Sequence, residues 1–311
     1  MTDTPKCRLV TRSDFDGLVC AVLLKERGLI DAIEFVHPKD MQDGKIPMGP
    51  NDISTNLPYV AGCHLAFDHH ASEMQRVSER PANHIIDPNA ASAARVVYDY
   101  YGGAQAFPRV SAEMMDAVDK ADSAQFSLDE ILNPKGWVLL SFLMDARTGL
   151  GRFREFRVSN YQLMMELIDY CRDHTIDEIL ALPDVAERAE LYAAHHDRAR
   201  AQLRRTAELY GKLVILDLRK EEPIYATNRF TLYALFPKAT VSIHVIWGVK
   251  QQNTAFAIGK SIIDRSSPLN VGELCLRYGG GGHAAAGTCQ IPNEDAEKVL
   301  GELMAAISAT E

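Results

Sequence analysis

The 311 residues of the chain carry a formal net charge of −9 at pH 7, and 47% of them are hydrophobic and 24% charged. This composition is that of an ordinary globular protein, long enough to form two domains. It excludes a broad basic surface for long nucleic acid, whose binding depends on neutralising phosphates, but it allows a local pocket for a small phosphate-containing substrate.

The six cysteines include no CxxC pair and lie mostly in apolar segments, as is typical of free thiols in a reducing compartment. The N-terminal stretch MTDTPKCRLVTRSDFDG lacks the apolar core and cleavage site of a signal peptide. No apolar run approaches the roughly 20 residues that a membrane helix needs. We therefore expect a cytoplasmic protein that has no membrane segment.

Short apolar runs alternate with helical patterns through the first part of the chain. A helix is expected at 17–28, and strands are expected at 7–11, 33–37, 52–57, 64–67 and 84–86. This alternation indicates a mostly parallel sheet, in which ligands bind beyond the carboxyl ends of the strands. Residues 38–50 (PKDMQDGKIPMGP) are expected to form an irregular loop. The motifs do not explain the residues His37, Lys39, Asp40 and Asp43 in and beside it.

From about residue 108 to 210 the pattern is helical, with one helix at about 111–121 and a long, solvent-exposed amphipathic helix over 184–211. Further strands are expected at 212–218, 239–248 and 253–261, followed by a helix near 271–278, a glycine run, a strand and a C-terminal helix. We predict an α/β fold with a mostly parallel-sheet N-terminal domain (1–150), a helical connector (151–211) and a smaller α/β C-terminal domain (212–311).

Acidic and histidine residues gather at the predicted strand ends. Asp14 and Asp16 form a DFDG turn, and two neighbouring carboxylates suit a hard divalent cation, although such a string also occurs as an ordinary helix N-cap. Asp68, His69 and His70 close a later strand. A single histidine is usually a packed or surface residue, but this triplet beside a second acidic strand end favours a metal or catalytic site.

Asp122 ends the helix expected at 111–121 and could complete a cation site. The pattern alone does not distinguish it from an ordinary helix-terminal acid, and Asp119 is a competitor for the same role.

A glycine run precedes His283 in the last part of the chain. Successive glycines let a backbone approach a ligand closely and present N–H groups to an anion, although a flexible linker has the same composition. The apolar surroundings disfavour a linker. Upstream, Arg265 and Ser266 offer a guanidinium and a hydroxyl that suit a phosphate.

The order of these motifs (DFDG, DHH, a helix-borne aspartate, an Arg-Ser pair and GGGGH) resembles the DHH phosphoesterase superfamily with its DHH-associated second domain, and is most similar to its exopolyphosphatase-related and nanoRNase-like branch. The resemblance spans nearly the whole chain. It implies an enzyme that hydrolyses phosphodiester or phosphoanhydride bonds with one or two Mn²⁺ or Mg²⁺ ions. It also implies a homodimer.

The resemblance further implies roles for individual residues. The metal ligands would be Asp14, Asp16, His69 and Asp122. Asp68 would orient the histidines, and His70 would contact the phosphate. The substrate-binding residues of the second domain, which would close over the site, would be Arg265, Ser266, Gly280, Gly281, Gly282 and His283.

Two positions depart from the family pattern. Arg12 stands where a metal-binding histidine is usual, and Asn56 stands where a bridging aspartate is usual, with Asp52 as the one nearby acid that could replace it. The two changes add about two positive charges, the charge of one divalent ion. We therefore hypothesise that Arg12 replaces one metal and clamps a phosphoryl oxygen in catalysis, with Asn56 as a substrate-binding residue. The alternative is a decayed site.

Three functions are compatible with this pattern. The leading one is an enzyme that hydrolyses a short phosphodiester, such as a short oligonucleotide or cyclic dinucleotide, or polyphosphate. The second is a catalytically silent nucleotide or phosphate sensor. The third, an inorganic pyrophosphatase, needs an intact two-metal site and ranks last. Neither long nucleic acid nor a membrane is an expected partner.

Overall fold

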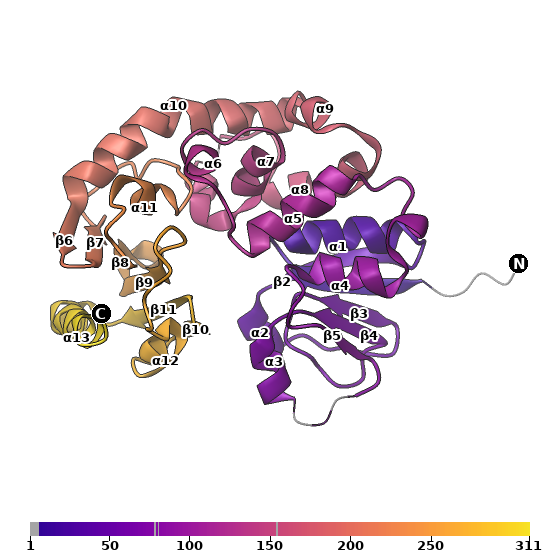
Figure 1. Ribbon diagram of the computed structural model, residues 1–311, viewed down its shortest axis with the longest axis horizontal. Coiled ribbons are helices and arrows are strands. Elements are labelled where there is room, and N and C mark those ends of the chain that lie inside the picture. Colours follow the sequence, from indigo (N-terminus) through magenta and orange to yellow (C-terminus); the bar gives the residue numbers. More distant parts are fainter. Residues whose placement is uncertain (1–5, 78, 80, 154) are drawn as a thin grey trace, which may run out of the picture. The chain divides into compact units, whose positions relative to one another are not determined.

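The computed structural model describes residues 6–77, 79, 81–153 and 155–311 (Figure 1). The first five residues, which belong to the N-terminus expected to lack a targeting signal, and residues 78, 80 and 154 of the predicted domains lie outside the described residues. The described chain forms two compact units. The first contains the residues up to Phe126, Pro134–Ala146 and Leu150–Glu190, and the second contains Ser127–Asn133, Arg147–Gly149 and Leu191–Glu311.

The first unit contains a five-stranded sheet in the order β2-β1-β3-β4-β5, and every pair of neighbouring strands in it is parallel. Its strands are β1 (Cys7–Arg12), β2 (Ile30–Val36), β3 (Asp52–Thr55), β4 (Leu65–Asp68) and β5 (His84–Ile86). Its helices are α1 (Phe15–Glu26), α2 (Pro38–Gln42), α3 (Ala71–Arg76), α4 (Ala93–Tyr100), α5 (Ala112–Asp122), α7 (Gly136–Met144), α8 (Asn160–Asp173) and α9 (Ile176–Leu180).

Helix α1 lies at the centre of the first unit. Every residue from Phe15 to Leu24 is buried, because the helix contacts β1 and is also covered by α4, α5 and α8. A helix that is apolar on all sides is stable only when it is enclosed in this way, and the sequence LVCAVLL meets that condition. The enclosed helix fixes the turn that joins it to β1, which carries Asp14 and Asp16.

The second unit contains a six-stranded sheet in the order β10-β11-β9-β8-β7-β6, in which β7 and β8 are parallel and the other pairs are antiparallel. Its strands are β6 (Ala207–Tyr210), β7 (Leu213–Asp217), β8 (Val241–Trp247), β9 (Thr254–Lys260), β10 (Gly281–His283) and β11 (Ala286–Ile291). Its helices are α6 (Leu128–Leu132), α11 (Thr231–Leu235), α12 (Val271–Leu276), α13 (Ala296–Ser308) and the later part of α10 (Pro183–Thr206).

Two apolar clusters hold the second unit together. One joins strand residues such as Ile243 and Phe256 to Leu274 of α12 and Leu303 of α13. The other joins Val214 and Leu216 of β7 to α11 and to Leu203 of α10. The alternating strand residues therefore pack against helices on both faces of this sheet. The predicted α/β fold with a mostly parallel N-terminal sheet is confirmed.

Three local expectations are wrong. Residues 38–50 are not wholly irregular, because Pro38–Gln42 forms α2 with His37 as its N-cap. The helix expected over 184–211 ends at Thr206, because Ala207–Tyr210 pairs with β7 across a turn at Gly211, whose φ is +60°. It is also not simply exposed, since Arg188, His195 and Leu203 are buried.

The division of the chain into 1–150, 151–211 and 212–311 stays a prediction. The compact units draw other limits, because Leu150–Glu190 falls in the first unit and the boundary between the units lies inside α10. No helix among the described residues is long and apolar enough to cross a membrane.

Candidate metal centre

The register of the parallel sheet brings polar residues to one edge. Arg12 is the last residue of β1, and Thr11 of that strand pairs with Thr55, the last residue of β3, which in turn pairs with Phe67 of β4. The residues that follow these strands therefore emerge side by side. This edge is where open parallel sheets bind ligands.

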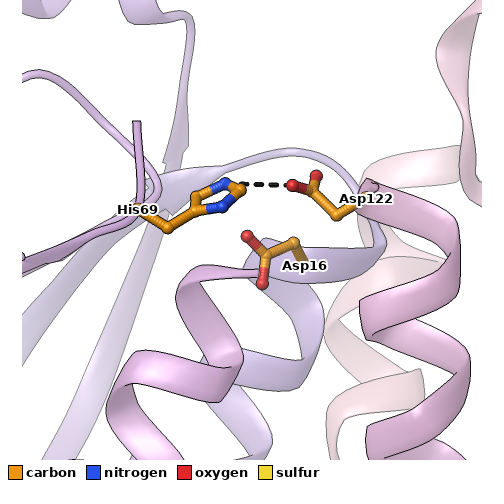
Figure 2. Close-up of side chains that lie close together, drawn as sticks. All are labelled: Asp16, His69 and Asp122. Atoms are coloured by element: carbon orange, nitrogen blue, oxygen red, sulfur yellow. Dashed lines mark ion pairs between the residues drawn. The ribbon is translucent and has the colours of Figure 1, made fainter. Parts of the chain in front are cut away.

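Three predicted ligands meet at this edge. Ligand atoms of Asp16, His69 and Asp122 all lie within 4.8 Å of one another, and Figure 2 shows the three side chains converging from α1, the end of β4 and the end of α5. The condition on which the predicted cation site depends is therefore met: segments far apart in sequence place two carboxylates and one imidazole around a common point.

Asp16 is held by the start of α4. Its Oδ2 accepts a hydrogen bond from the Ala93 amide at 3.0 Å, and its Oδ1 accepts one from the Ala94 amide at 2.8 Å. The side chain is 2% exposed. Burial raises the pKa of Asp16 well above its ordinary value, and the nearby carboxylates of Asp122 and Asp14 raise this pKa further. This site therefore favours a compensating positive charge.

His69 is oriented by the backbone. Its Nδ1 lies 3.2 Å from the Ala90 carbonyl oxygen, which can accept only from a protonated nitrogen. Nε2 is thereby directed to the cluster, 2.9 Å from Asp122 Oδ2. Burial lowers the pKa of His69, but the adjacent carboxylate of Asp122 outweighs this effect and raises the pKa to about 9. His69 in turn holds the pKa of Asp122 below its usual value, against the upward effect of burial.

The donor atoms fit a divalent cation. His69 Nε2 lies 2.9 Å from Asp122 but makes no hydrogen bond of good geometry among the described residues. Its lone pair is therefore suited to bind a cation placed between the two side chains. Two other buried acceptors, Asn56 Oδ1 and Asp68 Oδ2, also have no hydrogen-bond partner in the described part of the chain. Carboxylate and imidazole donors together suit Mn²⁺, Fe²⁺ or Zn²⁺.

Asp14, also predicted as a ligand, is not part of this cluster. Its carboxylate accepts from the Gly17 amide at 3.0 Å as the N-cap of α1, and it lies 2.9 Å from Arg12 Nε. Asn56 Nδ2 donates to Asp14 Oδ1 at 3.2 Å. Both sequence departures therefore contact the same carboxylate. The replacement of a metal ion by Arg12 stays a prediction.

Asn56 has an unusual backbone. Its φ is +54°, in the left-handed region that asparagine tolerates better than most residues, and its side chain is 1% exposed. Its backbone amide donates to the Phe67 carbonyl oxygen at 3.1 Å, which continues the pairing of β3 with β4 one residue beyond Thr55.

Asp68 supports the two histidines. Its Oδ1 accepts from the His69 backbone amide at 2.8 Å and lies 2.7 Å from His70 Nδ1. The two imidazole rings meet edge to face, with their centroids 4.5 Å apart. This buried carboxylate holds the ring of His70, and the orienting role of Asp68 in catalysis stays a prediction.

The two competing acids have other partners. Asp52, proposed as a substitute for the bridging aspartate, lies at the opposite end of β3 from Asn56 and receives Arg8 Nε at 2.8 Å. That possibility is therefore wrong. Asp119 accepts from Ser92 and Arg95 and is not part of the cation cluster. The sequence contains one signal for the contact between Ser92 and Asp119: Ser92 precedes an apolar run, as a helix N-cap does.

The residues predicted to bind substrate from the second domain lie in the second unit. Arg265 Nε donates to the Ile262 carbonyl oxygen at 3.2 Å, and the Ser266 amide donates to Asp264. The glycine run is not simply a loop before a strand, because Gly281–His283 forms β10 itself, paired with β11. The roles predicted for Arg265, Ser266, Gly280, Gly281, Gly282 and His283 stay predictions.

Two of the glycines have a structural reason. A side chain at Gly280 would meet the Thr288 carbonyl oxygen at 2.2 Å, and one at Gly282, whose φ is +153°, would meet the Ala286 carbonyl oxygen at 2.3 Å. At Gly281 a Cβ would meet nothing within 4 Å. Close packing of the hairpin therefore explains Gly280 and Gly282. It explains neither Gly281 nor Gly279, although the φ of +72° at Gly279 itself favours glycine.

The chain is similar to solved structures. It matches a pGpG-specific phosphodiesterase, PggH from Vibrio cholerae, at 61% sequence identity and a TM-score of 0.84, over 98% of this chain and 100% of that one. RecJ from Thermus thermophilus in complex with Mn²⁺ matches at 13% identity and a TM-score of 0.48, over 98% of this chain and 52% of that one. CDC45 from Entamoeba histolytica matches at 10% identity and a TM-score of 0.48, over 97% of this chain and 95% of that one. No family model and no curated protein sequence matches the chain.

Proposed function

The chain belongs to the DHH phosphoesterase family together with the pGpG-specific phosphodiesterase of Vibrio cholerae, and we propose that it hydrolyses a short linear dinucleotide of the same class, such as pGpG. The observation that carries this proposal is the convergence of Asp16, His69 and Asp122 in a chain that matches that enzyme over its full length. A small nucleotide substrate also agrees with the net charge of −9, which disfavours long nucleic acid.

We propose that Asp16, His69 and Asp122 hold one divalent ion, with Mn²⁺ as the best match to their mixed oxygen and nitrogen donors. When bound, such an ion polarises a phosphoryl oxygen and lowers the pKa of a coordinated water. The orientation of His69 through Ala90 and of Asp16 through the α4 amides keeps the ligand atoms in place before the ion binds.

Arg12 is proposed to replace a second ion. Its Nε lies 2.9 Å from Asp14 Oδ2, and we propose that the Nη end of the guanidinium binds a phosphoryl oxygen. A fixed guanidinium stabilises negative charge that develops on that oxygen, although it cannot activate water. Asn56 supports this arrangement by donating to Asp14.

Asp68 is proposed to orient His70 toward the phosphate of the substrate. Its short contact with His70 Nδ1 fixes the ring, and its bond to the His69 amide links both histidines to the same carboxylate. A homodimer and a contribution of the second unit to substrate binding are proposed from the family resemblance. Light scattering of the purified protein should give the mass of two chains.

Hydrolysis by the purified protein tests the proposal. With Mn²⁺ present, pGpG should react with one water at its internal phosphodiester, and each molecule should yield two of GMP. Cyclic di-GMP, polyphosphate and pyrophosphate, assayed in parallel, should react far more slowly. The Asp122→Asn variant, purified in the same way, is the control for a contaminating nuclease.

The other outcomes distinguish the competing functions. Binding of pGpG without turnover would replace the enzyme by a nucleotide sensor. Faster hydrolysis of pyrophosphate than of any dinucleotide would instead support a pyrophosphatase and contradict the proposed substrate class.

A further inference from the structure

Two members of the cation cluster depend on one pair of helices. Both carboxylate oxygens of Asp16 accept hydrogen bonds from the first two amides of α4, at Ala93 and Ala94. Asp122 is the last residue of α5. The separation of these two carboxylates therefore depends on how the first turn of α4 lies against α5, as well as on the packing of α1 against α5.

Asp119 joins these two helices. It lies one turn before Asp122 on α5, and it accepts from Ser92 Oγ at 2.7 Å and from Arg95 Nε at 2.8 Å, with Arg95 Nη2 at 2.6 Å. Ser92 is the fully buried N-cap of α4, and its Oγ accepts from the Arg95 amide at 3.0 Å. One carboxylate on α5 thus binds both the cap and the first turn of the helix that holds Asp16.

The geometry of this contact makes it stiff. The Arg95 guanidinium binds Asp119 through two nitrogens, and it also lies over the Tyr98 ring, 5.3 Å from the centroid. Both nitrogens lie at the same oxygen, Oδ2, while Ser92 binds Oδ1, so the carboxylate is held from two sides. Both oxygens of Asp119 have partners, so this acid is unsuited to bind the ion itself.

We propose that Asp119, Ser92 and Arg95, here called the α4–α5 clamp, are positioning residues that set the distance between Asp16 and Asp122 and thereby the affinity of the cation site. This inference rests on the proposed function, because it assumes that these residues bind a divalent ion. The clamp contacts neither the ion nor the substrate. It acts through the α4 amides on one side and through one turn of α5 on the other.

The experiment is a titration of Asp119→Asn with Mn²⁺, in which electron paramagnetic resonance measures the unbound Mn²⁺. The variant should bind Mn²⁺ roughly 10–100-fold more weakly than the wild type, the range that loss of an outer partner of a metal ligand typically costs. Arg95→Lys, which keeps the charge but loses the planar fork, should show a smaller loss and provides a second test if Asp119→Asn fails to fold. Circular dichroism of each variant checks that the helices are retained.

Glu113→Gln is the matched control, because this exposed acid lies on the same helix and the substitution makes the same change of charge. It should bind Mn²⁺ as the wild type does. Excess Mn²⁺ should restore hydrolysis to Asp119→Asn but not to Asp122→Asn, which has lost a ligand. Equal affinities of Asp119→Asn and the wild type, or an equal loss in Glu113→Gln, would overturn the clamp alone. Failure of the wild-type protein to bind Mn²⁺ would overturn the proposed function and the clamp with it.

Discussion

Arg12 Nε lies 2.9 Å from Asp14 Oδ2 across the turn between β1 and α1. The first acid of the DFDG motif is therefore neutralised by the chain itself, and Asn56 donates to the same carboxylate from the end of β3. These two contacts support the proposal that Arg12 stands in for one of the two ions that the family resemblance implies.

Restoring the usual residues should create a second ion site. The wild-type protein is expected to bind one Mn²⁺ per chain, and the double variant Arg12→His with Asn56→Asp is expected to bind two, because it replaces a cation and an amide by two ligands beside Asp14. Metal analysis after dialysis measures the ratio. Adding Asp14→Asn should remove the second ion only, and two ions in the wild type would refute the replacement by Arg12.

Loss of a proposed ligand should cost more than loss of an outer partner. Asp122→Asn removes a carboxylate that faces His69 and Asp16. Its Mn²⁺ affinity should therefore fall by more than about 100-fold, the upper limit that is typical for loss of an outer partner. Calorimetric titration measures it. Glu113→Gln, at the exposed start of α5, makes the same charge change and should leave the affinity as it is. Tight binding by Asp122→Asn would contradict the assigned cluster.

Ion binding should strengthen as pH rises. The pKa of His69 is raised to about 9, against the effect of burial, by Asp122 and Asp16, so below that pH the ring carries a proton on each nitrogen. The proton on Nε2 must leave before an ion binds there. Affinity should therefore increase up to about tenfold per pH unit and level off above the pKa.

The linked proton can be measured directly. Calorimetry in two buffers of different ionisation enthalpy should show about one proton released per Mn²⁺ near pH 7.5. His69→Gln, which has no such proton, should release none on any residual binding. Affinity that does not change with pH would mean that His69 is not a ligand.

Asp52 should contribute to stability and not to catalysis. Arg8 binds its carboxylate and holds its pKa below the usual value, against the effect of burial. Asp52→Asn should lower the free energy of unfolding by about 1–2 kcal/mol at neutral pH, a range that allows for solvent screening of the partly exposed Arg8. Urea denaturation measures the change, and the kcat of the variant should match that of the wild type.

The sign of the pH dependence follows from the lowered pKa of Asp52. Its stabilising effect is complete above the pKa of an unfolded aspartate and is lost as pH falls through the lower folded pKa. The wild type and Asp52→Asn should therefore approach the same stability in acid. A constant difference at all pH values would show that the charge of Asp52 has no part in it.

The glycine run can be divided into structural and functional members. Gly281→Ala meets no atom within 4 Å and should leave the urea midpoint unchanged, whereas Gly282→Ala would collide with the Ala286 carbonyl oxygen and should lower it. If the Gly281 backbone approaches the substrate, Gly281→Ala should raise KM for pGpG. An unchanged KM would remove Gly281 from the predicted substrate-binding residues.

The cation cluster could be predicted because each member ends a regular element or follows one. Asp16 follows a strand, His69 follows another and Asp122 ends a helix, and parallel sheets collect such ends at one edge. The residues that hold these ligands in place were harder to predict from the sequence. Ala93 and Ala94 bind Asp16 through backbone amides, which no residue type marks in the sequence. Asp119 and Asp122 lie one turn apart on α5, and the sequence does not show which of them faces the cluster.

The errors arise where tertiary contacts override local pattern. The helical pattern continues through Ala207–Tyr210, but pairing with β7 across Gly211 makes this segment a strand. In the loop after β2, Pro38 suits the first position of a helix and His37 caps it, so five residues become α2. Hydrophobic spacing alone predicts neither the pairing of 207–210 with β7 nor the cap at His37.

Asp16, His69 and Asp122 come from three separate elements of the first unit, so an ion bound by all three would cross-link them. An unfolded chain has no such site, and the ion would therefore bind the native state preferentially. At one hundred times its dissociation constant it would add about 2.7 kcal/mol to stability. Heat resistance would then report the metal content of a preparation, and a chelated sample would melt at a lower temperature before any substrate is added.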